Sequence, residues 1–317
     1  MAQMKEQALL TLCIPIYNRL TFLERQLERM SEDKDLFDEK IQLIISDNCS
    51  TEDLRSCCGK YEQKGLKLNY HRNEVNLGPD GNFEWCFSHA DGKYVWLLGS
   101  DDVPVSGFLV KLLGYLEHDD YGLIHLSMRK KEKELTISST SDDMAMMVNY
   151  WITFMSSNII RTESLKTVDL SEYRNSFLIQ VPAYLNACCS YNNNAILYLP
   201  QYFEKETDFA NNGGYNFFQV FVTNLYGIYE SFIEKGLLSK QAFDKMIKIE
   251  YKESLVRYIS KVLILGEKGN FKTENSWVAL GKYYANKPYA YYFVLKELVK
   301  CCIVGILKTI MHFRVYL

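Results

Sequence analysis

The sequence predicts an α/β protein in which helices cover both faces of a mostly parallel sheet, with a helical region after it. Between residues 9 and 128, apolar segments rich in β-forming residues alternate with helix-start signals. Beyond residue 214, two long segments show the apolar repeat of helices instead. We therefore expect a first domain over residues 1–215 and a helical region over residues 216–317.

Five segments of the first domain are predicted strands: residues 9–18, 41–48, 66–73, 94–102 and 121–128. Helix-start signals separate them, as capping-box pairs or as a proline in a first helical turn: Thr21 with Glu24, Ser50 with Asp53, and Pro104. The helix that begins at Thr21 is expected to end near Met30, and further helices are expected over 81–90 and 105–119. Strands joined by helices in this order indicate parallel pairing with right-handed crossovers.

The pattern loosens after residue 128. Residues 129–140 are predicted to form a charged turn or hairpin, 144–155 a helix and 156–165 a short strand. Helical periodicity returns over 214–233 and 239–263, and in the second segment eight apolar residues share one face: Phe243, Met246, Ile247, Leu255, Tyr258, Ile259, Val262 and Leu263. Gly266 and Gly269 end that helix.

Composition excludes several classes of protein. A net charge of -3 argues against a general nucleic-acid binder, which needs a basic surface. Nine cysteines without C-x-x-C spacing, and an N-terminus without a signal peptide, indicate reduced thiols in the cytoplasm. No run of about 18 apolar residues predicts a membrane span.

The C-terminal residues 291–317 combine dense apolar positions with four cations: Lys296, Lys300, Lys308 and Arg314. This composition predicts a helix that lies in the interface of the cytoplasmic membrane, with its cations toward anionic headgroups. The alternative is a terminal helix packed on its own domain.

The chemistry is expected where the strands end, because ligands of open α/β sheets bind outside the carboxyl ends of the strands. Neither a P-loop nor a G-x-G-x-x-G motif is present. Asp47, at the end of the second strand, has the acceptor oxygens to read an N–H group of a nucleotide base. Asp101 and Asp102, after the fourth strand, are suited to Mg²⁺ or Mn²⁺ bridging a diphosphate. Taken singly, these residues could also be helix-start signals.

Four motifs in this order, "CIPIYNR", "IISDNCSTED", "NLGPDGNF" and "WLLGSDD", resemble the nucleotide-sugar-binding half of family 2 glycosyltransferases with the GT-A fold. The resemblance covers about residues 8–128. Within the family, these motifs are similar to the branch that includes abequosyltransferases of bacterial O-antigen and capsule synthesis. It implies metal-dependent transfer of a hexosyl or deoxyhexosyl group from a nucleoside-diphosphate sugar. The acceptor is expected to be a saccharide that is lipid-linked at the inner face of the cell membrane.

The resemblance also assigns roles to residues. Pro15, Tyr17 and Asn18 match the motif that borders the nucleoside, Asp47 the residue that contacts the base, and Asn82 a residue beside the donor. Asp101 and Asp102 match the last two carboxylates of the family's Asp-x-Asp-Asp, and Asp101 also borders the donor.

Two positions depart from the family pattern: Gly99 replaces the first Asp of that motif, and Asp80 replaces a basic residue. No motif selects a catalytic base among the acidic residues of the expected acceptor region, which are Glu163, Asp169, Glu172 and Asp208. A sugar nucleotidyltransferase and a non-catalytic saccharide-binding scaffold are the alternative functions.

Overall fold

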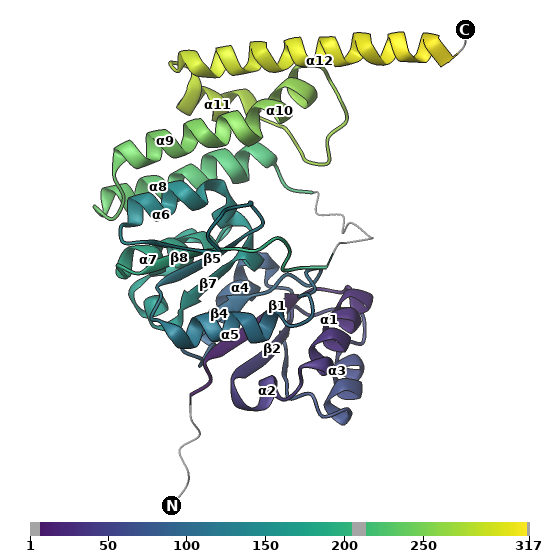
Figure 1. Ribbon diagram of the computed structural model, residues 1–317, viewed down its shortest axis with the longest axis vertical. Coiled ribbons are helices and arrows are strands. Elements are labelled where there is room, and N and C mark those ends of the chain that lie inside the picture. The colour runs from purple at the N-terminus through teal and green to yellow at the C-terminus, as the bar shows by residue number, and fades with distance from the viewer. Residues whose placement is uncertain (1–6, 205–213, 316–317) are drawn as a thin grey trace, which may run out of the picture. The chain divides into compact units, whose positions relative to one another are not determined.

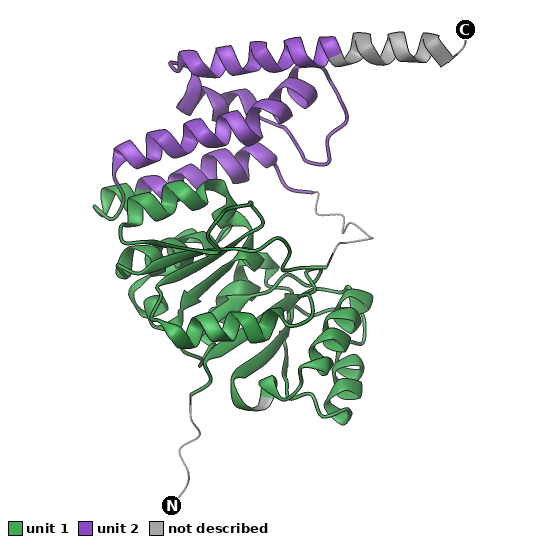
Figure 2. Ribbon diagram, in the orientation of Figure 1, with its two compact units in different colours: residues 1–210, 231–238 green, residues 211–230, 239–317 purple. Residues whose placement is uncertain are grey.

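The computed structural model describes residues 7–204 and 214–315, with side chains except at residues 38 and 304–315 (Figure 1). The chain divides into two compact units (Figure 2). Unit 1 contains residues 1–210 and 231–238, and unit 2 contains residues 211–230 and 239–317. The predicted α/β class with a helical C-terminal region is confirmed.

Unit 1 is built on a mixed sheet, eight-stranded within the described residues, in the order β3-β2-β1-β4-β7-β5-β8-β6. The strands are β1 (Leu10–Ile16), β2 (Ile41–Asp47), β3 (Asn69–Arg72), β4 (Tyr94–Leu97), β5 (Leu123–Ser127), β6 (Leu135–Ser138), β7 (Asn158–Arg161) and β8 (Asn194–Tyr198). The first four strands pair in parallel, as do β5 and β8. Strand β7 is antiparallel to both β4 and β5, and β6 is antiparallel to β8.

Helices cover both faces of this sheet because its strands are apolar on both sides. On one face, Leu10, Leu12 and Ile14 of β1 belong to a core with α1 (Leu20–Glu32), α3 (Leu54–Gln63) and α5 (Phe108–His118). The other face packs against α4 (Gly78–Ser88), α6 (Ser141–Val148) and α7 (Gln180–Ser190). The short helix α2 (Leu36–Glu39) contacts β2.

The predicted helix over 144–155 is shorter than expected. Asn149, with φ 52°, ends α6, and two 3-10 turns follow, η1 (Asn149–Thr153) and η2 (Met155–Ser157). Two more turns, η3 (Thr162–Thr167) and η4 (Leu170–Tyr173), lead to α7. The sequence did not predict α7, because residues 180–188 are all buried and give no apolar stripe. It did not predict β8 either.

Unit 2 is helical, as the periodicity predicted. Its elements are the π-helical segment η5 (Gln219–Asn224), α8 (Leu225–Glu234, whose last turn belongs to unit 1), α9 (Lys240–Glu250), η6 (Tyr251–Leu255), α10 (Val256–Tyr258), η7 (Ile259–Ile264), α11 (Ser276–Tyr284) and α12 (Pro288–Val315). The helix predicted over 239–263 therefore contains two π-helical segments, η6 and η7. Among the described residues, no helix is both long and apolar enough to cross a membrane.

A buried carboxyl group lies inside unit 2. Glu250 is 3% exposed and shares a polar cluster with the hydroxyl groups of Tyr226 and Tyr284. Burial raises the pKa of Glu250 to about 8, against the opposing effect of a hydrogen bond from Tyr226. The folded chain therefore binds this proton more tightly than the unfolded chain does.

This raised pKa predicts how stability changes with pH. The contribution of Glu250 is fully present below its ordinary pKa of 4.5 and is lost as the pH rises through about 8. Glu250→Gln should therefore raise the melting temperature clearly at pH 8.5 and much less at pH 5.5. Thermal unfolding followed by circular dichroism measures this, with the exposed Glu234→Gln as control; equal shifts at both pH values would contradict it.

Candidate functional site

The carboxyl ends of the first four strands meet at one edge of the sheet. The register places Asp47 of β2 beside Ile16 of β1 and beside Arg72 of β3, and Leu97 of β4 beside Cys13 of β1. Pro15 is buried within β1, whereas Tyr17, just beyond its end, is 46% exposed at the rim. The predicted site residues therefore come from adjoining segments of one edge.

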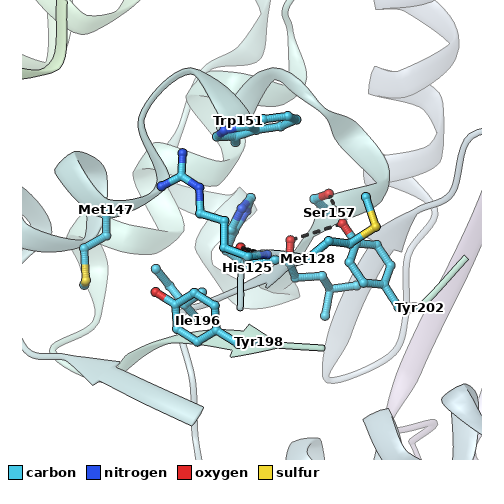
Figure 3. Close-up of a pocket in the computed structure, with 11 residues that line it drawn as sticks. His125, Met128, Met147, Trp151, Ser157, Ile196, Tyr198 and Tyr202 are labelled. Carbon is cyan, nitrogen blue, oxygen red and sulfur yellow. Dashed lines mark hydrogen bonds between the residues drawn. The ribbon is translucent and has the colours of Figure 1, made fainter. Parts of the chain in front are cut away.

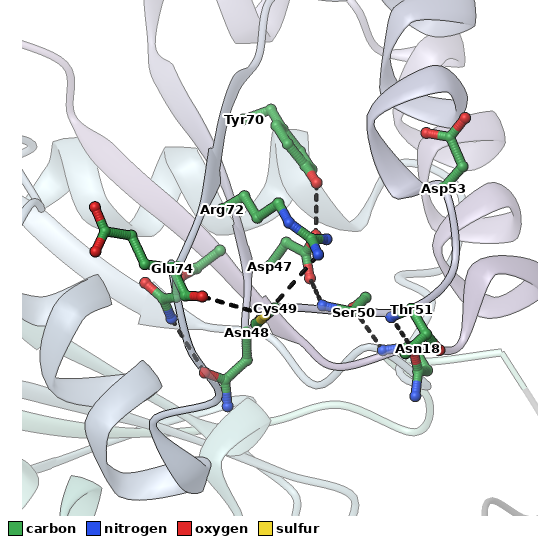
Figure 4. A network of polar contacts seen from close by, with 12 residues as sticks. Asn18, Asp47, Asn48, Cys49, Ser50, Thr51, Asp53, Tyr70, Arg72 and Glu74 are labelled. Carbon is green, nitrogen blue, oxygen red and sulfur yellow. Dashed lines mark hydrogen bonds and ion pairs between the residues drawn. The ribbon is translucent and has the colours of Figure 1, made fainter.

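Asp47 is the centre of a polar network at this edge (Figure 4). Its side chain is fully buried; Oδ1 accepts a hydrogen bond from the Ser50 amide at 2.8 Å. Oδ2 accepts one from the Tyr70 hydroxyl at 2.6 Å and forms an ion pair with Arg72 at 2.9 Å. Since Arg72 is 45% exposed, its guanidinium group is the part of this network that faces solvent.

The turn after β1 is tied to the turn after β2. Asn18 and Arg19 both have positive φ, 58° and 65°, which turns the chain sharply before α1. The Asn18 amide donates to Ser50 Oγ at 2.7 Å, and Asn18 Oδ1 accepts from the amide and the hydroxyl of Thr51 (Figure 4). These contacts hold a left-handed backbone that non-glycine residues seldom adopt.

Asn82 is buried beneath the edge of the sheet, whereas the resemblance placed it beside the donor. It is 2% exposed, and its amide group joins the end of β2 to the turn after β3. Asn82 Oδ1 accepts from Ser46 Oγ and Asn73 Nδ2, and its Nδ2 donates to the Ser46 carbonyl. Asn48 uses its side chain in the same way, between Asn73 and the loop at 76–78.

The two carboxylates after β4 point to different partners. Asp101 Oδ2 lies 3.4 Å from Arg19 Nη1, and the side chain of Asp101 is 18% exposed. Asp102 Oδ2 accepts a 2.5 Å hydrogen bond from Ser156 Oγ, which in turn accepts from the Gly99 amide at 2.8 Å. The loop therefore presents Asp101 at the rim and holds Asp102 against the start of β7.

Gln26 of α1 holds the backbone of this loop. It is fully buried, and its Nε2 donates to the carbonyls of Gly99 and Asp102, both at 2.7 Å. Gly99 is packed closely: a Cβ atom there would lie 2.8 Å from Asp102 Oδ2 and 3.1 Å from Ser156 Oγ. The missing first carboxylate of the family motif therefore coincides with a position where a side chain would displace the Asp102 carboxylate and the Ser156 hydroxyl group.

Asp101 and Asp102 are two carboxylates of one loop, fewer than a closed metal site needs. Within the described part of the chain, no three or more His, Cys, Asp or Glu side chains are grouped to bind a metal. Mg²⁺ commonly needs only one or two protein carboxylates when substrate phosphates and water complete its shell. Asp101 and Asp102 are the residues that would hold it here.

Asp80 is buried against the loop before α7. It is 7% exposed and accepts hydrogen bonds from the amides of Phe177 and Ile179, at 2.9 and 3.4 Å. Burial raises its pKa, although these amides oppose the shift. The acidic residue that departs from the family pattern therefore anchors the loop before α7.

Sequence reasoning left the catalytic base open, and the structure removes one candidate. Strand β7 is antiparallel to β4 and pairs Arg161 with Tyr94, so Glu163 follows at the opposite edge of the sheet. Asp169 caps η4 through the Ser171 amide, and Glu172 forms an ion pair with Lys235. Asp208 lies outside the described residues.

Gln26, Arg72 and Ser156 are among the residues of this site that were not predicted. Gln26 could have been found because it is a polar residue on the otherwise apolar face of α1. Arg72 could have been found because it lies at the end of a strand. Nothing in the sequence around Ser156 indicated its contact with a residue 54 positions away.

These features define a class: a GT-A-type fold with polar strand exits and a carboxylate pair at one edge. The chain is structurally similar to TarS 1-349 of S. aureus in complex with UDP-GlcNAc, with a TM-score of 0.65, 17% identity, and coverage of 91% of this chain and 89% of that one. The model of glycosyl transferase family 2 matches residues 11–179, more than half of the chain. The protein belongs to glycosyltransferase family 2, which confirms the resemblance that the motifs indicated.

Two characterised relatives are similar over the N-terminal part. The abequosyltransferase RfbV of Salmonella typhimurium is 38% identical over 124 residues, which are 39% of this chain and 36% of the relative. A GalNAc(5)-diNAcBac-PP-undecaprenol beta-1,3-glucosyltransferase of Campylobacter jejuni is 29% identical over 105 residues, 33% of each chain. The matches thus span about a third of the length of these relatives.

The packing at Gly99 leads to a prediction for Gly99→Ala. The added Cβ should push the Asp102 carboxylate away from Ser156 and lower the free energy of unfolding by about 1–3 kcal/mol, as overpacking does. Urea unfolding measures the loss. Gly114→Ala is the matched control, because a Cβ there meets nothing within 4 Å and should be neutral or stabilising. If Gly99→Ala unfolds like the wild type, the loop is not closely packed.

Proposed function

We propose that this protein transfers a hexosyl or deoxyhexosyl group from a nucleoside-diphosphate sugar to a lipid-linked saccharide in bacterial surface polysaccharide synthesis. One observation carries the proposal: the exits of β1 to β4 form one bonded edge that presents Tyr17, Arg19, Arg72 and Asp101 together. The edge offers an aromatic ring, two guanidinium groups and a carboxylate to a nucleotide.

The nucleoside would lie over β1 and β2, bordered by Pro15, Tyr17 and Asn18. Asp47 would contact the base once Arg72 has moved outward, because the carboxylate has no exposed surface while Arg72 covers it. Asn82 would have a positioning role, because its hydrogen bonds to Ser46 and Asn73 hold the end of β2 against the turn after β3.

The diphosphate would lie between Arg19 and Asp101, at the ends of β1 and β4. A bound Mg²⁺ or Mn²⁺ would supply neutralisation of the leaving diphosphate. Arg19 provides a further positive charge at this place, and Gln26 holds the backbone of the carboxylate loop fixed. Preorganised charges of this kind stabilise a transition state without the cost of reorganising them during the reaction.

The acceptor is proposed to be presented at the cytoplasmic face of the membrane. In α12, four apolar side chains with i, i+4 spacing are exposed: Tyr291 (64%), Leu295 (63%), Val299 (50%) and Ile303 (52%). We call these four residues the α12 stripe. Lys296 and Lys300 flank it and would contact anionic headgroups. The sequence predicted that this membrane-facing surface continues over residues 304–317, whose side chains lie outside the described part of the chain.

Of the two alternatives, the non-catalytic scaffold has an observation in its favour: Asp102 is bonded to Ser156, and Gly99 supplies no third carboxylate. The nucleotidyltransferase has none, since the turn at residues 15–19 is not the Gly-rich, basic loop that such enzymes need. Ligand binding separates the scaffold from the enzyme.

Metal-dependent binding of a nucleoside diphosphate is the first prediction of this proposal. One of UDP, CDP, GDP, ADP and dTDP should raise the melting temperature, and only when Mn²⁺ is present. Asp101→Asn should remove most of this stabilisation because the shared cation loses a carboxylate. The control is Asp91→Asn, an exposed residue before β4, at the other edge of the sheet. If no diphosphate stabilises the wild type, the scaffold function is favoured.

Membrane association through the α12 stripe is the second prediction. The double variant Leu295→Asp/Val299→Asp should abolish co-sedimentation with vesicles that contain anionic lipid, because buried apolar area is replaced by repelled charge. Val110→Asp, in the exposed part of α5, is the control and should sediment like the wild type. Equal sedimentation of all three proteins would rule out this docking surface.

A further inference from the structure

A cavity of about 260 Å³ opens at the carboxyl ends of β5 and β8 (Figure 3). Its walls are mostly apolar or aromatic and come from β5, the residue after it, α6, η1 and β8: Leu126, Met128, Met147, Trp151, Ile196 and Tyr198. Ser127, Arg129, Ser157 and Tyr202 add polar atoms to the lining. Trp151 and Tyr198 lie on opposite sides of His125. The cavity is below the about 300–1,000 Å³ typical of pockets for drug-sized ligands, so it suits one small ring.

His125 is the buried polar side chain that this cavity offers to a ligand. It is 5% exposed, and its Nδ1 lies 2.9 Å from Asn158 Oδ1. The Asn158 amide cannot be turned around, because its Nδ2 donates to the carbonyls of Ile152 and Phe154. Carbonyl oxygens only accept, so Oδ1 must face His125.

It follows that His125 carries its proton on Nδ1, which leaves a lone pair on Nε2. Nε2 has no hydrogen-bond partner within residues 7–204 and 214–315. Burial lowers the pKa of His125 to about 4, aided by the charge of Arg129, so the ring stays neutral near pH 7. The cavity therefore holds a fixed hydrogen-bond acceptor among walls that are mostly apolar and include the Arg129 side chain.

The cavity adjoins the carboxylate loop without overlapping the nucleotide edge. Ser157 lines the cavity, and its neighbour Ser156 is bonded to Asp102. In the sheet, β7 separates β4 from β5, so the cavity lies about 10 Å beyond the carboxylate strand, given the usual spacing of about 4.8 Å per strand.

We propose that this cavity binds one saccharide ring of the acceptor, whose C–H face packs on Trp151 or Tyr198 and one of whose hydroxyl groups donates a hydrogen bond to His125 Nε2. The inference rests on the proposed glycosyltransferase function and assigns its acceptor subsite. A hydroxyl group suits the site, because a bare ring nitrogen can only accept a hydrogen bond and a sugar hydroxyl can donate one.

The test is nitrogen NMR of the full chain with ¹⁵N-labelled histidine. The His125 signals, assigned by their loss in His125→Asn, should show a protonated Nδ1 and a bare Nε2. The protein is then titrated with methyl glycosides of glucose, galactose, mannose, rhamnose and N-acetylglucosamine, with diamagnetic Mg²⁺ and the stabilising diphosphate present. At least one glycoside should move the Nε2 signal.

The variant His125→Asn isolates the acceptor atom, because the Asn amide nitrogen can keep the bond to Asn158 while Nε2 is lost. It should weaken glycoside binding about tenfold, as expected for a lost hydrogen bond. His118→Gln, exposed at the end of α5, should have no effect. Diphosphate stabilisation should be unchanged in both variants.

Each contrary outcome is distinguishable. A protonated Nε2, no response to any glycoside, or equal glycoside affinity in His125→Asn would overturn the subsite. A shift of the Nε2 signal by the nucleotide sugar alone, with none by glycosides, would show that the cavity holds the donor sugar. Failure of every diphosphate to stabilise the wild type would instead overturn the proposed function itself.

Discussion

The buried charge of Asp47 constrains the whole candidate site. A carboxylate with no exposed surface must be paired and hydrogen-bonded, since its burial would otherwise cost several kcal/mol. Its partners come from the turn after β2 and from β3. Ser50, whose amide is bonded to Asp47, also accepts a hydrogen bond from the Asn18 amide after β1. One charge thus fixes three strand ends relative to one another.

The carboxylate loop is held by a second set of contacts, and these come from distant parts of the chain. Gln26 reaches its backbone from α1, and Ser156 reaches Asp102 from the turn before β7. The close packing at Gly99 belongs to the same arrangement. The loop is therefore positioned by side chains that bind no metal themselves, which is how a preorganised site keeps its geometry without a ligand.

The antiparallel strand β7 links the two halves of the proposed site. The segment that enters it provides Ser156 to the carboxylate loop, Ser157 to the cavity and Asn158 to His125. Because the strand then runs to the opposite edge, Glu163 lies away from the carboxyl ends of β1 to β4. A strand inserted against the direction of its neighbours thus joins the nucleotide edge to the proposed acceptor subsite.

The sequence by itself determined the α/β class, the family, and the segments that meet at the carboxyl ends of β1, β2 and β4. It could do so because consecutive parallel strands end at one edge, so that residues 15–18, 47–48 and 101–102 meet whatever the packing details are. Only the tertiary structure decided that Asp47 and Asn82 are buried, that Asp80 anchors a loop, and that His125 faces a cavity. Those outcomes depend on contacts between residues far apart in sequence and on the direction of β7. Helix α7 shows the same limit: it is buried on all sides and leaves no periodic signal to read.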